Sequence, residues 1–353
     1  MKIVELFSLE LSDVHIEILS YVCVFLASLI LTKLLRRYAL LKNVIDIPND
    51  RSSHSTPTPR GGGISIVVSF LIILLVYIIF NRVDFMVGSS IFVSGLLVAI
   101  IGFADDHSHI DAKWRLLIHA LASFGVVFAI GGLPTIDLWN FEIELHYFGY
   151  FLSVVAIIWI LNLFNFMDGI DGIASVEAIT ATLFAGLFLS ISSPDSSLVP
   201  LLWLLSASVC GFLVLNFPPA KIFMGDAGSG FLGFILASLM LASAHVEKSM
   251  LWVWLTLLGV FIVDATFTLI HRLICGEKIH EAHRSHAYQF ASRKYKSHLK
   301  VTLSVLVINT LWLAPIAYLI ISESLNGVLG VCIAYFPLVW LALKFNAGAK
   351  EIK

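Results

Sequence analysis

Long apolar runs alternate with short polar segments along nearly the whole chain. A bilayer core of about 30 Å needs about 20 apolar residues per helical crossing, so each run of that length predicts a transmembrane helix. Eleven such runs occur, at residues 16–35, 62–81, 87–104, 114–131, 148–166, 173–191, 198–217, 228–245, 250–270, 300–322 and 326–344. The pattern predicts an all-α fold: a polytopic membrane helix bundle of about 11 transmembrane helices, forming one integral membrane domain over residues 1–353.

The composition indicates the same class of protein. Of the 353 residues, 59% are apolar and 13% are charged, and the mean hydropathy is +0.94. Soluble domains carry about 25% charged residues, so a soluble enzyme is excluded, and disorder would need high charge and low hydrophobicity. The net charge of −2 gives no reason to expect nucleic acid as a partner. No Cys-x-x-Cys pair occurs among the four cysteines, and we expect no disulfide.

The lysines and arginines predict the orientation, because cytoplasmic loops of membrane proteins retain these residues. One set of alternate loops holds only Lys2, Arg82 and Lys248, and the other set holds the remaining 19 of the 22 basic residues. We therefore expect the amino terminus outside and the carboxyl terminus in the cytoplasm. No cleavage site of small residues follows the first run, so its helix is expected to be retained.

Two polar clusters in the first half of the chain lie on the predicted cytoplasmic side. Residues 57–63 read Pro-Thr-Pro-Arg-Gly-Gly-Gly, and the glycines allow a ligand to approach the backbone closely. For this segment alone, the alternative is an ordinary basic loop. Asp105 and Asp106 stand side by side at a membrane boundary, where a divalent cation would relieve their repulsion and lost hydration. Arg115, on the next helix, could face the same site.

Two further clusters have spacings typical of a ligand site. Asn165, Asp168 and Asp171 recur every three residues and so follow one stripe of a helix. Polar groups at membrane depth usually face a cavity, and a helix-packing seam would not explain two carboxylates beside glycines. Later, Asn216 precedes two prolines that end a helix, and Asp226 begins the next, where free amides attract anions.

The last cluster combines an intramembrane acid with histidines. Asp264 lies within an apolar run, and we expect it to pair with Arg272. His283, Arg284 and His286 supply cationic and hydrogen-bonding groups suited to phosphate. Zinc is not expected, because the chain has neither a cysteine set nor a His-Glu-x-x-His helix.

Together these clusters place carboxylates, amides, glycine turns and a basic rim on one membrane face. Phosphoryl transfer uses this combination: magnesium held by aspartates offsets the charge of a diphosphate, and basic groups position it for in-line attack. A site at the bilayer boundary predicts one lipid substrate and one water-soluble substrate.

The same residues resemble those of the polyprenyl-phosphate N-acetylhexosamine-1-phosphate transferases. Four motifs follow the family's order within residues 44–290: Pro-Thr-Pro-Arg-Gly-Gly, Asp-Asp, Asn-x-x-Asn-x-x-Asp-Gly-x-Asp-Gly and Met-Gly-Asp-x-Gly-Ser. The resemblance implies transfer of a sugar-1-phosphate from a UDP-N-acetylhexosamine to undecaprenyl phosphate, with release of UMP. It implies Mg²⁺ as cofactor, which Mn²⁺ could replace, and a cytoplasm-facing site in the bacterial inner membrane. It leaves open whether the chain forms a homodimer.

The resemblance also implies roles for individual residues. Asp226 would be the principal magnesium ligand, assisted by Asn165. The catalytic residues would be Asp105 and Asp106 on the lipid-phosphate side, where either could deprotonate or orient the attacking phosphate, and Asp168 near the metal or diphosphate. The remaining residues would bind substrate. Asp171 and Asn216 would lie near the uridine, and His283, Arg284 and His286 would lie near the diphosphate or sugar. Arg60 and Arg115 would belong to the basic rim.

The last cytoplasmic loop departs from the common family pattern. Many members have His-x-His-His there, whereas this chain reads His286-Ala-Tyr288-Gln289. The string is similar to the O-antigen-initiating branch, which uses 6-deoxy sugars such as N-acetylfucosamine or N-acetylquinovosamine. N-acetylglucosamine is the alternative, and the missing third histidine disfavours the peptidoglycan enzyme.

Other classes explain the pattern less well. In a CDP-alcohol phosphotransferase, Ala-Arg follows Asp-Gly, but here Asp171-Gly172 leads into Ile173. A transporter of an anionic substrate would place its charges near the bilayer midplane, whereas these cluster at one edge. Direct displacement is favoured over a phospho-enzyme, because no nucleophile with its own base stands apart from the acids.

Overall fold

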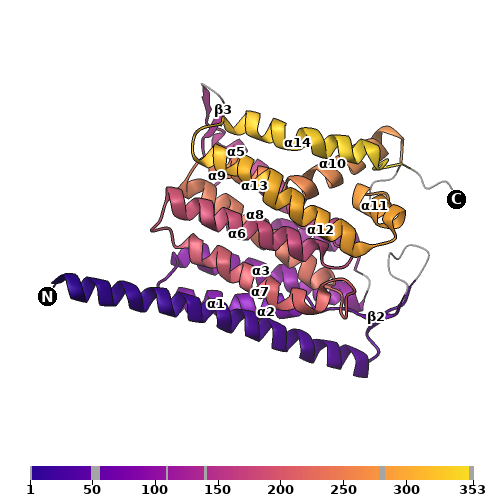
Figure 1. The fold of residues 1–353 in the computed structure, drawn as a ribbon, viewed down its shortest axis with the longest axis horizontal. Helices are drawn as coiled ribbons and strands as arrows, with labels where there is room; N and C mark the ends of the chain where they lie inside the picture. The colour runs from indigo at the N-terminus through magenta and orange to yellow at the C-terminus, as the bar shows by residue number, and fades with distance from the viewer. Residues whose placement is uncertain (1, 49–55, 109, 139–140, 278–282, 350–353) are drawn as a thin grey trace.

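The computed structural model describes residues 2–48, 56–108, 110–138, 141–277 and 283–349. This part of the chain is a bundle of α-helices with a few very short strands (Figure 1). The helices are α1 (Lys2–Leu41), α2 (Ile64–Ile79), α3 (Phe85–His107), α4 (Ala112–Ile130), α5 (His146–Met167), α6 (Ile173–Ser192), α7 (Leu198–Asn216), α8 (Asp226–Val246), α9 (Met250–Leu257), α10 (Gly259–Ile274), α11 (Ala287–Tyr295), α12 (His298–Ile308), the π-helix η1 (Asn309–Leu313), α13 (Ala314–Ile321) and α14 (Gly327–Lys344).

The helical prediction is confirmed, with two small departures. β1 (Ile45–Asp46) pairs with β2 (Thr58–Pro59), and β3 (Ile136–Leu138) pairs with β4 (Phe141–Ile143), both antiparallel. β1 and β2 join the two ends of the loop between α1 and α2. The strands therefore shape loops at the ends of the bundle and leave its helical interior unchanged.

The predicted number of spans needs correction. Every predicted apolar run is helical, but within the described residues nine helices are long and apolar enough to cross a membrane. The pair α9 and α10 would make a tenth, although it bends by 69° at the break between Leu257 and Gly259. α2 has only 16 residues, because Gly61 to Gly63 form a turn before it.

α8 lies at the centre of the bundle and is buried along its whole apolar length. It packs against α3 on one side and α5 on another. Glycines permit this packing: a Cβ atom on Gly233 would lie 2.8 Å from the carbonyl oxygen of Ile160, and one on Gly228 would lie 2.6 Å from the Cα of Gly63. Small residues bring helices together in the same way in other membrane bundles.

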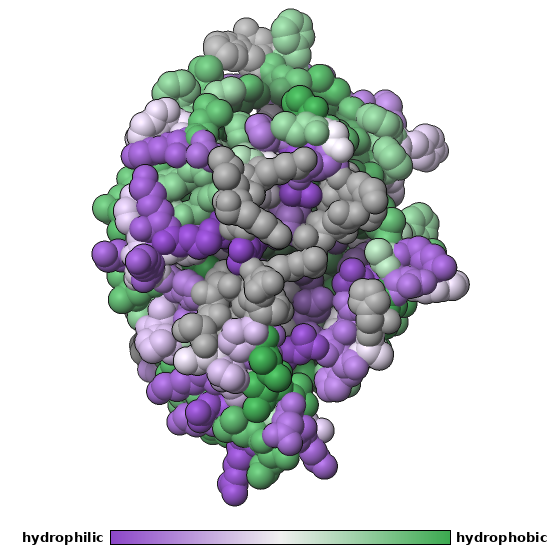
Figure 2. Space-filling view, turned by 90° about the vertical axis from the view of Figure 1, so that its right-hand side faces the viewer, coloured by the Kyte–Doolittle hydropathy of each residue, from purple (hydrophilic) through white to green (hydrophobic). Residues whose placement is uncertain are grey.

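The outer flank of the bundle is apolar and exposed. Phe128 is 71% exposed and Phe336 is 79% exposed, and many Leu and Ile side chains on the outer helices are also uncovered. In Figure 2, polar residues gather on the end of the bundle that carries α11, and apolar residues lie along the rim. A bilayer covers such a flank, so the chain is a multi-pass membrane protein.

A buried polar group joins α6 to the π-helix. Glu177 is fully buried and accepts a hydrogen bond from the Nδ2 of Asn309 at 2.7 Å, and the same nitrogen donates to Thr180 at 2.8 Å. A π-helical turn often marks a helix under local constraint. Here the widened turn presents Asn309 to the acid, which satisfies one oxygen of a carboxyl group inside the apolar core.

The contact between Gly63 and Gly228 generates a stability prediction. Gly228→Ala should lower the free energy of unfolding by about 1–3 kcal/mol, because the new methyl group would press on backbone atoms that cannot turn away. Gly230→Ala is the matched control, since its Cβ would find nothing nearer than 3.9 Å. Thermal unfolding in detergent measures both variants. Equal stability of the two would contradict the close approach of α2 and α8.

Candidate functional site

A cavity of about 310 Å³ opens at the polar end of the bundle. It collects residues from the loop before α2, the ends of α3 and α5, and the starts of α8, α11 and α12. The predicted residues Arg60, Asp106, Asn165, Asp168, Asp171, Asn216 and Asp226 all line it. Four predicted acids from distant parts of the chain therefore share one pocket, whereas the predicted Asp105 and Arg115 do not line it.

Asp106 holds the start of α8. Its carboxylate accepts hydrogen bonds from the backbone N–H groups of Asp226 and Ala227, at 3.2 Å each, and its backbone carbonyl accepts a bond from the guanidinium of Arg60. The first amides of a helix have no partner within the helix, and they attract negative charge. Gly102 allows the approach, because a Cβ there would lie 2.7 Å from the Cα of Ala227. Asp106 is thus placed beside Asp226.

The neighbouring Asp105 has different partners. Its carboxylate pairs with Arg115 of α4 and accepts the backbone N–H of Ile110 at 2.8 Å. Arg115 also lies 3.7 Å from the carboxylate of Asp226. A second hollow of about 350 Å³ opens here, lined by Arg60, Asp105, Asp106, His107, Ser108 and Asp226. The two hollows share Arg60, Asp106 and Asp226 in their linings, and Arg115 lies between Asp105 and Asp226.

Asp168 lies just beyond the last turn of α5, where its environment disfavours the charged form. Removal from bulk water raises the pKa of its carboxyl group well above the usual range, and the charges of Asp226, Asp171 and Asp106 raise that pKa further. The pocket thus contains mutually repelling oxygens that a cation would stabilise.

Magnesium suits this set of oxygens. Among the described residues, no three His, Cys, Asp or Glu groups are placed so that they could enclose an ion by themselves. Mg²⁺, however, is usually held by one or two carboxylates, with substrate phosphates and water completing its coordination. Asp226 and the amide oxygen of Asn165, which both line the pocket, are groups of the required kind.

Asp171 and Asn216 tie the pocket loops together. Asp171 accepts the backbone N–H of Ala220 at 3.0 Å, and its other oxygen lies 3.2 Å from the Nδ1 of His298. Asn216 accepts the N–H of Gly172 at 3.1 Å and donates to the carbonyl of Ile222 at 3.0 Å. Both residues hold the loops after α5 and α7 in register, and their proposed contact with uridine stays a prediction.

Among the pocket residues that were not predicted as site residues are three with acid, amide or imidazole side chains: Asp46, Gln289 and His298. Gln289 was noted only as a departure from the histidine pattern. His298 begins α12, where it opens an apolar run and belongs to none of the polar motifs. Its place after a lysine-rich segment on the predicted cytoplasmic side was the only signal that could have revealed it.

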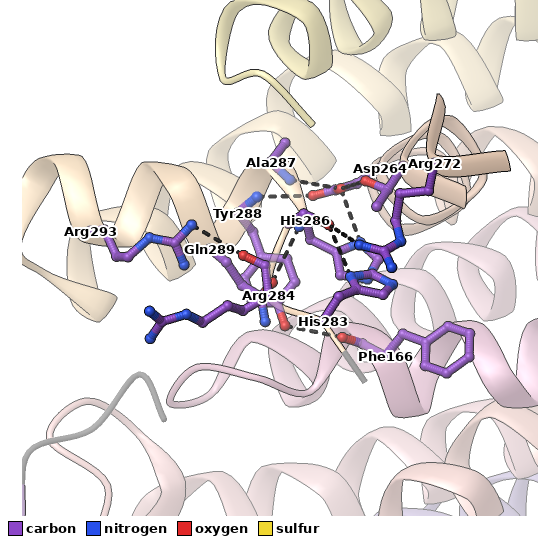
Figure 3. A network of polar contacts seen from close by, with 12 residues as sticks. Phe166, Asp264, Arg272, His283, Arg284, His286, Ala287, Tyr288, Gln289 and Arg293 are labelled. Carbon is purple, nitrogen blue, oxygen red and sulfur yellow. Dashed lines mark hydrogen bonds and ion pairs between the residues drawn. The ribbon is translucent and has the colours of Figure 1, made fainter. Parts of the chain in front are cut away.

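The predicted residues His283, Arg284 and His286 do not line the pocket. They belong to a network behind it, shown in Figure 3. His286 is 2% exposed, and its Nδ1 lies 3.3 Å from a carboxylate oxygen of Asp264. Burial, followed by the charges of His286 and Arg272, lowers the pKa of His283 to about 4. Both effects favour the neutral form of His283, and the predicted contact of these three residues with the diphosphate or sugar stays a prediction.

The predicted pairing of Asp264 with Arg272 is wrong. Asp264 instead accepts the backbone N–H groups of Ala287 and Tyr288, at 2.9 Å each, and so caps α11 (Figure 3). Arg272 pairs with Glu277 at 2.7 Å. The hydroxyl of Tyr288 donates to the carbonyl of Phe166 at 3.0 Å. This network fixes α11 against the end of α5, with Gln289 in the pocket.

Comparison with known proteins identifies the family. Residues 88–244 match the model of glycosyl transferase family 4. A probable undecaprenyl-phosphate N-acetylglucosaminyl 1-phosphate transferase of Bacillus subtilis is 27% identical over 298 residues, which cover 82% of this chain and 80% of that protein. A phospho-N-acetylmuramoyl-pentapeptide-transferase of Prochlorococcus marinus is 31% identical over 269 residues, 69% of this chain and 72% of the relative. The chain belongs to the polyprenyl-phosphate N-acetylhexosamine-1-phosphate transferases.

Membership of this transferase family confirms the resemblance that the four motifs indicated. An undecaprenyl-phosphate alpha-N-acetylglucosaminyl 1-phosphate transferase of Thermotoga maritima is similar over a comparable length, with 27% identity covering 83% of this chain and 89% of the relative. The similarity to these relatives extends well beyond the matched residues 88–244. The pocket of this transferase also draws on residues outside 88–244, from Asp46 to His298.

In this transferase, His298 should affect donor binding through Asp171. His298→Ala removes the imidazole whose Nδ1 lies 3.2 Å from the Asp171 carboxylate. The loss of a hydrogen bond to a charged group should raise the KM for the nucleotide-sugar donor by about tenfold. His298→Gln, which can still donate, should retain most of the affinity. Steady-state kinetics separate KM from kcat. An unchanged KM in the alanine variant would remove His298 from the donor site.

His283 should give this transferase a pH-dependent stability. The folded pKa of about 4 lies below the ordinary value of 6.5, so between these values the unfolded chain binds a proton that the folded chain does not. The free energy of unfolding therefore keeps its full value, as far as His283 is concerned, above pH 6.5, and it decreases as the pH falls toward 4. His283→Gln should flatten this part of the curve of unfolding midpoint against pH. A slope identical to that of the wild type would contradict the burial of His283.

Proposed function

We propose that this transferase moves an N-acetylhexosamine-1-phosphate from a UDP-sugar to undecaprenyl phosphate and releases UMP. The observation that carries the proposal is the shared pocket of Asp106, Asp168 and Asp226 beside Arg60. The family transfers sugar-1-phosphates to polyprenyl phosphates, and the relatives from Bacillus subtilis and Thermotoga maritima are named for undecaprenyl phosphate. A transporter of an anionic substrate is not favoured, because the acids lie together at one end of the bundle.

The proposed reaction is a direct displacement. An oxygen of the lipid phosphate attacks the phosphorus that bears the sugar, the bond from that phosphorus to the bridging oxygen breaks, and UMP leaves with the bridging oxygen. A phosphate monoester has its second pKa near 6, so at pH 7 the attacking oxygen is already mostly deprotonated. Asp105 and Asp106 are then not needed as bases. They act mainly by positioning other groups: Asp105 holds the guanidinium of Arg115, and Asp106 holds the first turn of α8.

We propose Mg²⁺ as the cofactor, held by Asp226 with Asn165, and Mn²⁺ as a substitute. When bound, the ion would neutralise the diphosphate and the leaving phosphate. Arg60, which lines both hollows, and Arg115, which lies 3.7 Å from the carboxylate of Asp226, would bind the phosphates of the two substrates. Asp171 and Asn216 would lie beside the uridine of the donor.

The sugar is proposed to be a 6-deoxy-N-acetylhexosamine, N-acetylfucosamine or N-acetylquinovosamine, with N-acetylglucosamine as the second candidate. Gln289 lines the pocket and Tyr288 holds α11 against α5, and these two positions carry the departure from the family's histidine pattern. The second candidate rests on the printed names of the relatives from Bacillus subtilis and Thermotoga maritima. The product would begin O-antigen or another surface polysaccharide.

We propose the amino terminus outside, the carboxyl terminus in the cytoplasm, and the pocket facing the cytoplasm of a bacterial inner membrane. The distribution of basic residues supports this orientation. In Figure 1, α1 begins at one end of the bundle and α14 finishes at the opposite end, which also carries α11. Such an arrangement requires an odd number of crossings. A homodimer is compatible with the exposed apolar flank.

Membranes that contain this transferase should release UMP when given undecaprenyl phosphate and the correct UDP-sugar. A panel of UDP-N-acetylfucosamine, UDP-N-acetylquinovosamine and UDP-N-acetylglucosamine identifies the donor. Chelation of divalent ions should abolish release, and Mg²⁺ or Mn²⁺ should restore it. Uptake of a substrate without UMP release would instead support a transporter.

Asp226→Asn tests the metal assignment in the same assay. Loss of the carboxylate that would hold the ion should lower kcat by about 10²-fold or more. Asp111→Asn is the matched control, because Asp111 is an exposed acid at the same end of the bundle, where it pairs with Lys113. Normal turnover by the Asp226 variant would refute its role, and an equal loss in both variants would indicate a general effect of surface charge.

A further inference from the structure

A further cavity, distinct from the two hollows described above, lies on the opposite face of α11 from the catalytic pocket. Its volume is about 330 Å³, and α10, α11, α12 and α14 form its walls. Most of the lining is apolar, including Val263, Ala291, Val305, Leu341 and Ala342. The two cavities share no lining residue among those described. The proposed reaction makes no use of the cavity between α10, α11, α12 and α14.

The cavity lies between two helices that separate toward the predicted cytoplasmic side. α13 packs against α14, but beyond the π-helix and Pro315 the continuation α12 contacts α11 and α6 instead. In Figure 1, α11 occupies the region between the ends of α12 and α14. α12 and α14 both belong to segments long and apolar enough to span a membrane, and Ser304 of the cavity lining is exposed, so we infer that the space between these helices opens toward hydrocarbon. Its natural occupant is therefore a lipid chain.

Basic residues at the end of this cleft select the lipid's head group. Lys344 lines the cavity, with its Nζ 4.6 Å from the ring centroid of Trp340, and the Nζ of Lys294 lies 5.7 Å from the ring of Phe345. The carboxylate of Asp264 on the inner wall is already bonded to the amides of α11. A lipid chain moving from bilayer to cleft stays in hydrocarbon, so selection must come from the head group. The charge favours an anionic phosphate.

The inner wall of the cleft connects it to the catalytic pocket. Tyr288 lines the cleft, and its hydroxyl bonds to the carbonyl of Phe166, two residues before Asp168. The next residue along α11, Gln289, lines the catalytic pocket. A chain that fills the cleft would press on the back of α11 and limit its movement away from the pocket.

We propose that this cleft binds an anionic phospholipid of the cytoplasmic leaflet, with an acyl chain in the cavity and its phosphate beside Lys344, and that the bound lipid braces α11. The site is separate from the catalytic pocket, because the two cavities share no lining residue among those described. The placement in the cytoplasmic leaflet rests on the orientation proposed above, whereas lipid binding itself does not depend on the proposed reaction.

Lipid retention tests the proposal without any activity measurement. Protein purified in mild detergent is analysed by native mass spectrometry after incubation with phosphatidylglycerol. Ser304→Phe, which places a ring at the exposed edge of the cavity, and Lys344→Gln should each lower phosphatidylglycerol binding, the latter by roughly fivefold, as expected for one lysine near an anionic head group. Leu303→Phe and Lys300→Gln are matched controls on α12, outside the lining.

Hydrogen exchange of residues 287–295 tests the bracing. Delipidated wild type should exchange faster in this segment, and phosphatidylglycerol, but not phosphatidylethanolamine, should restore protection. Unchanged binding in both Ser304→Phe and Lys344→Gln, equal losses in the controls, or displacement of phosphatidylglycerol by undecaprenyl phosphate would overturn the proposal. Melting temperatures confirm that each variant is folded. Failure of UMP release with normal lipid binding would count against the proposed function alone.

Discussion

The pocket depends on the hydrogen bonds that the first backbone N–H groups of α8 donate to the carboxylate of Asp106. α8 is buried along its apolar length, so its amino-terminal N–H groups need an acceptor where little water is present. Asp106 supplies that acceptor from α3 and thereby stands beside Asp226. Two neighbouring carboxylates at a membrane boundary require positive charge. Arg60 and Arg115 provide part of it, and the remaining oxygens suit a divalent ion and a diphosphate.

The close approach of backbones makes this arrangement possible. In a bilayer, lipid chains are as apolar as leucine, so helices associate through packing and hydrogen bonds more than through exclusion of water. Gly63 and Gly228 meet nearly backbone to backbone, and Gly102 allows α3 to reach the first turn of α8. Any side chain at these positions would separate the loop of Arg60, the acid of α3 and the acid of α8. The glycines of the motifs are thus structural conditions for the chemistry.

Much of the fold and the acidic pocket could be predicted because charge is rare in this chain. An aspartate such as Asp168 or Asp226 stands out beside an apolar run, and the runs themselves locate the helices. The bend between α9 and α10 could not be predicted, since residues 250–270 read as one continuous apolar run. Asp264 bonds to backbone amides, which leave no trace in the sequence, so its true partner was missed. His298 was missed because it opens an apolar run.

The histidine segment shows why a motif can be recognised and its geometry still be mistaken. His286 and His283 look like phosphate-binding groups in a polar loop, yet the capping of α11 by Asp264 turns them toward a buried network. The same capping positions the next two residues, which are also buried: Tyr288 bonds to Phe166, and Gln289 lines the pocket. An uncharged amide at this point of the pocket wall can bind sugar hydroxyl or acetamido groups, whereas a protonated histidine would favour phosphate. Discrimination among sugars should therefore depend on how firmly α11 is held as much as on the identity of residue 289.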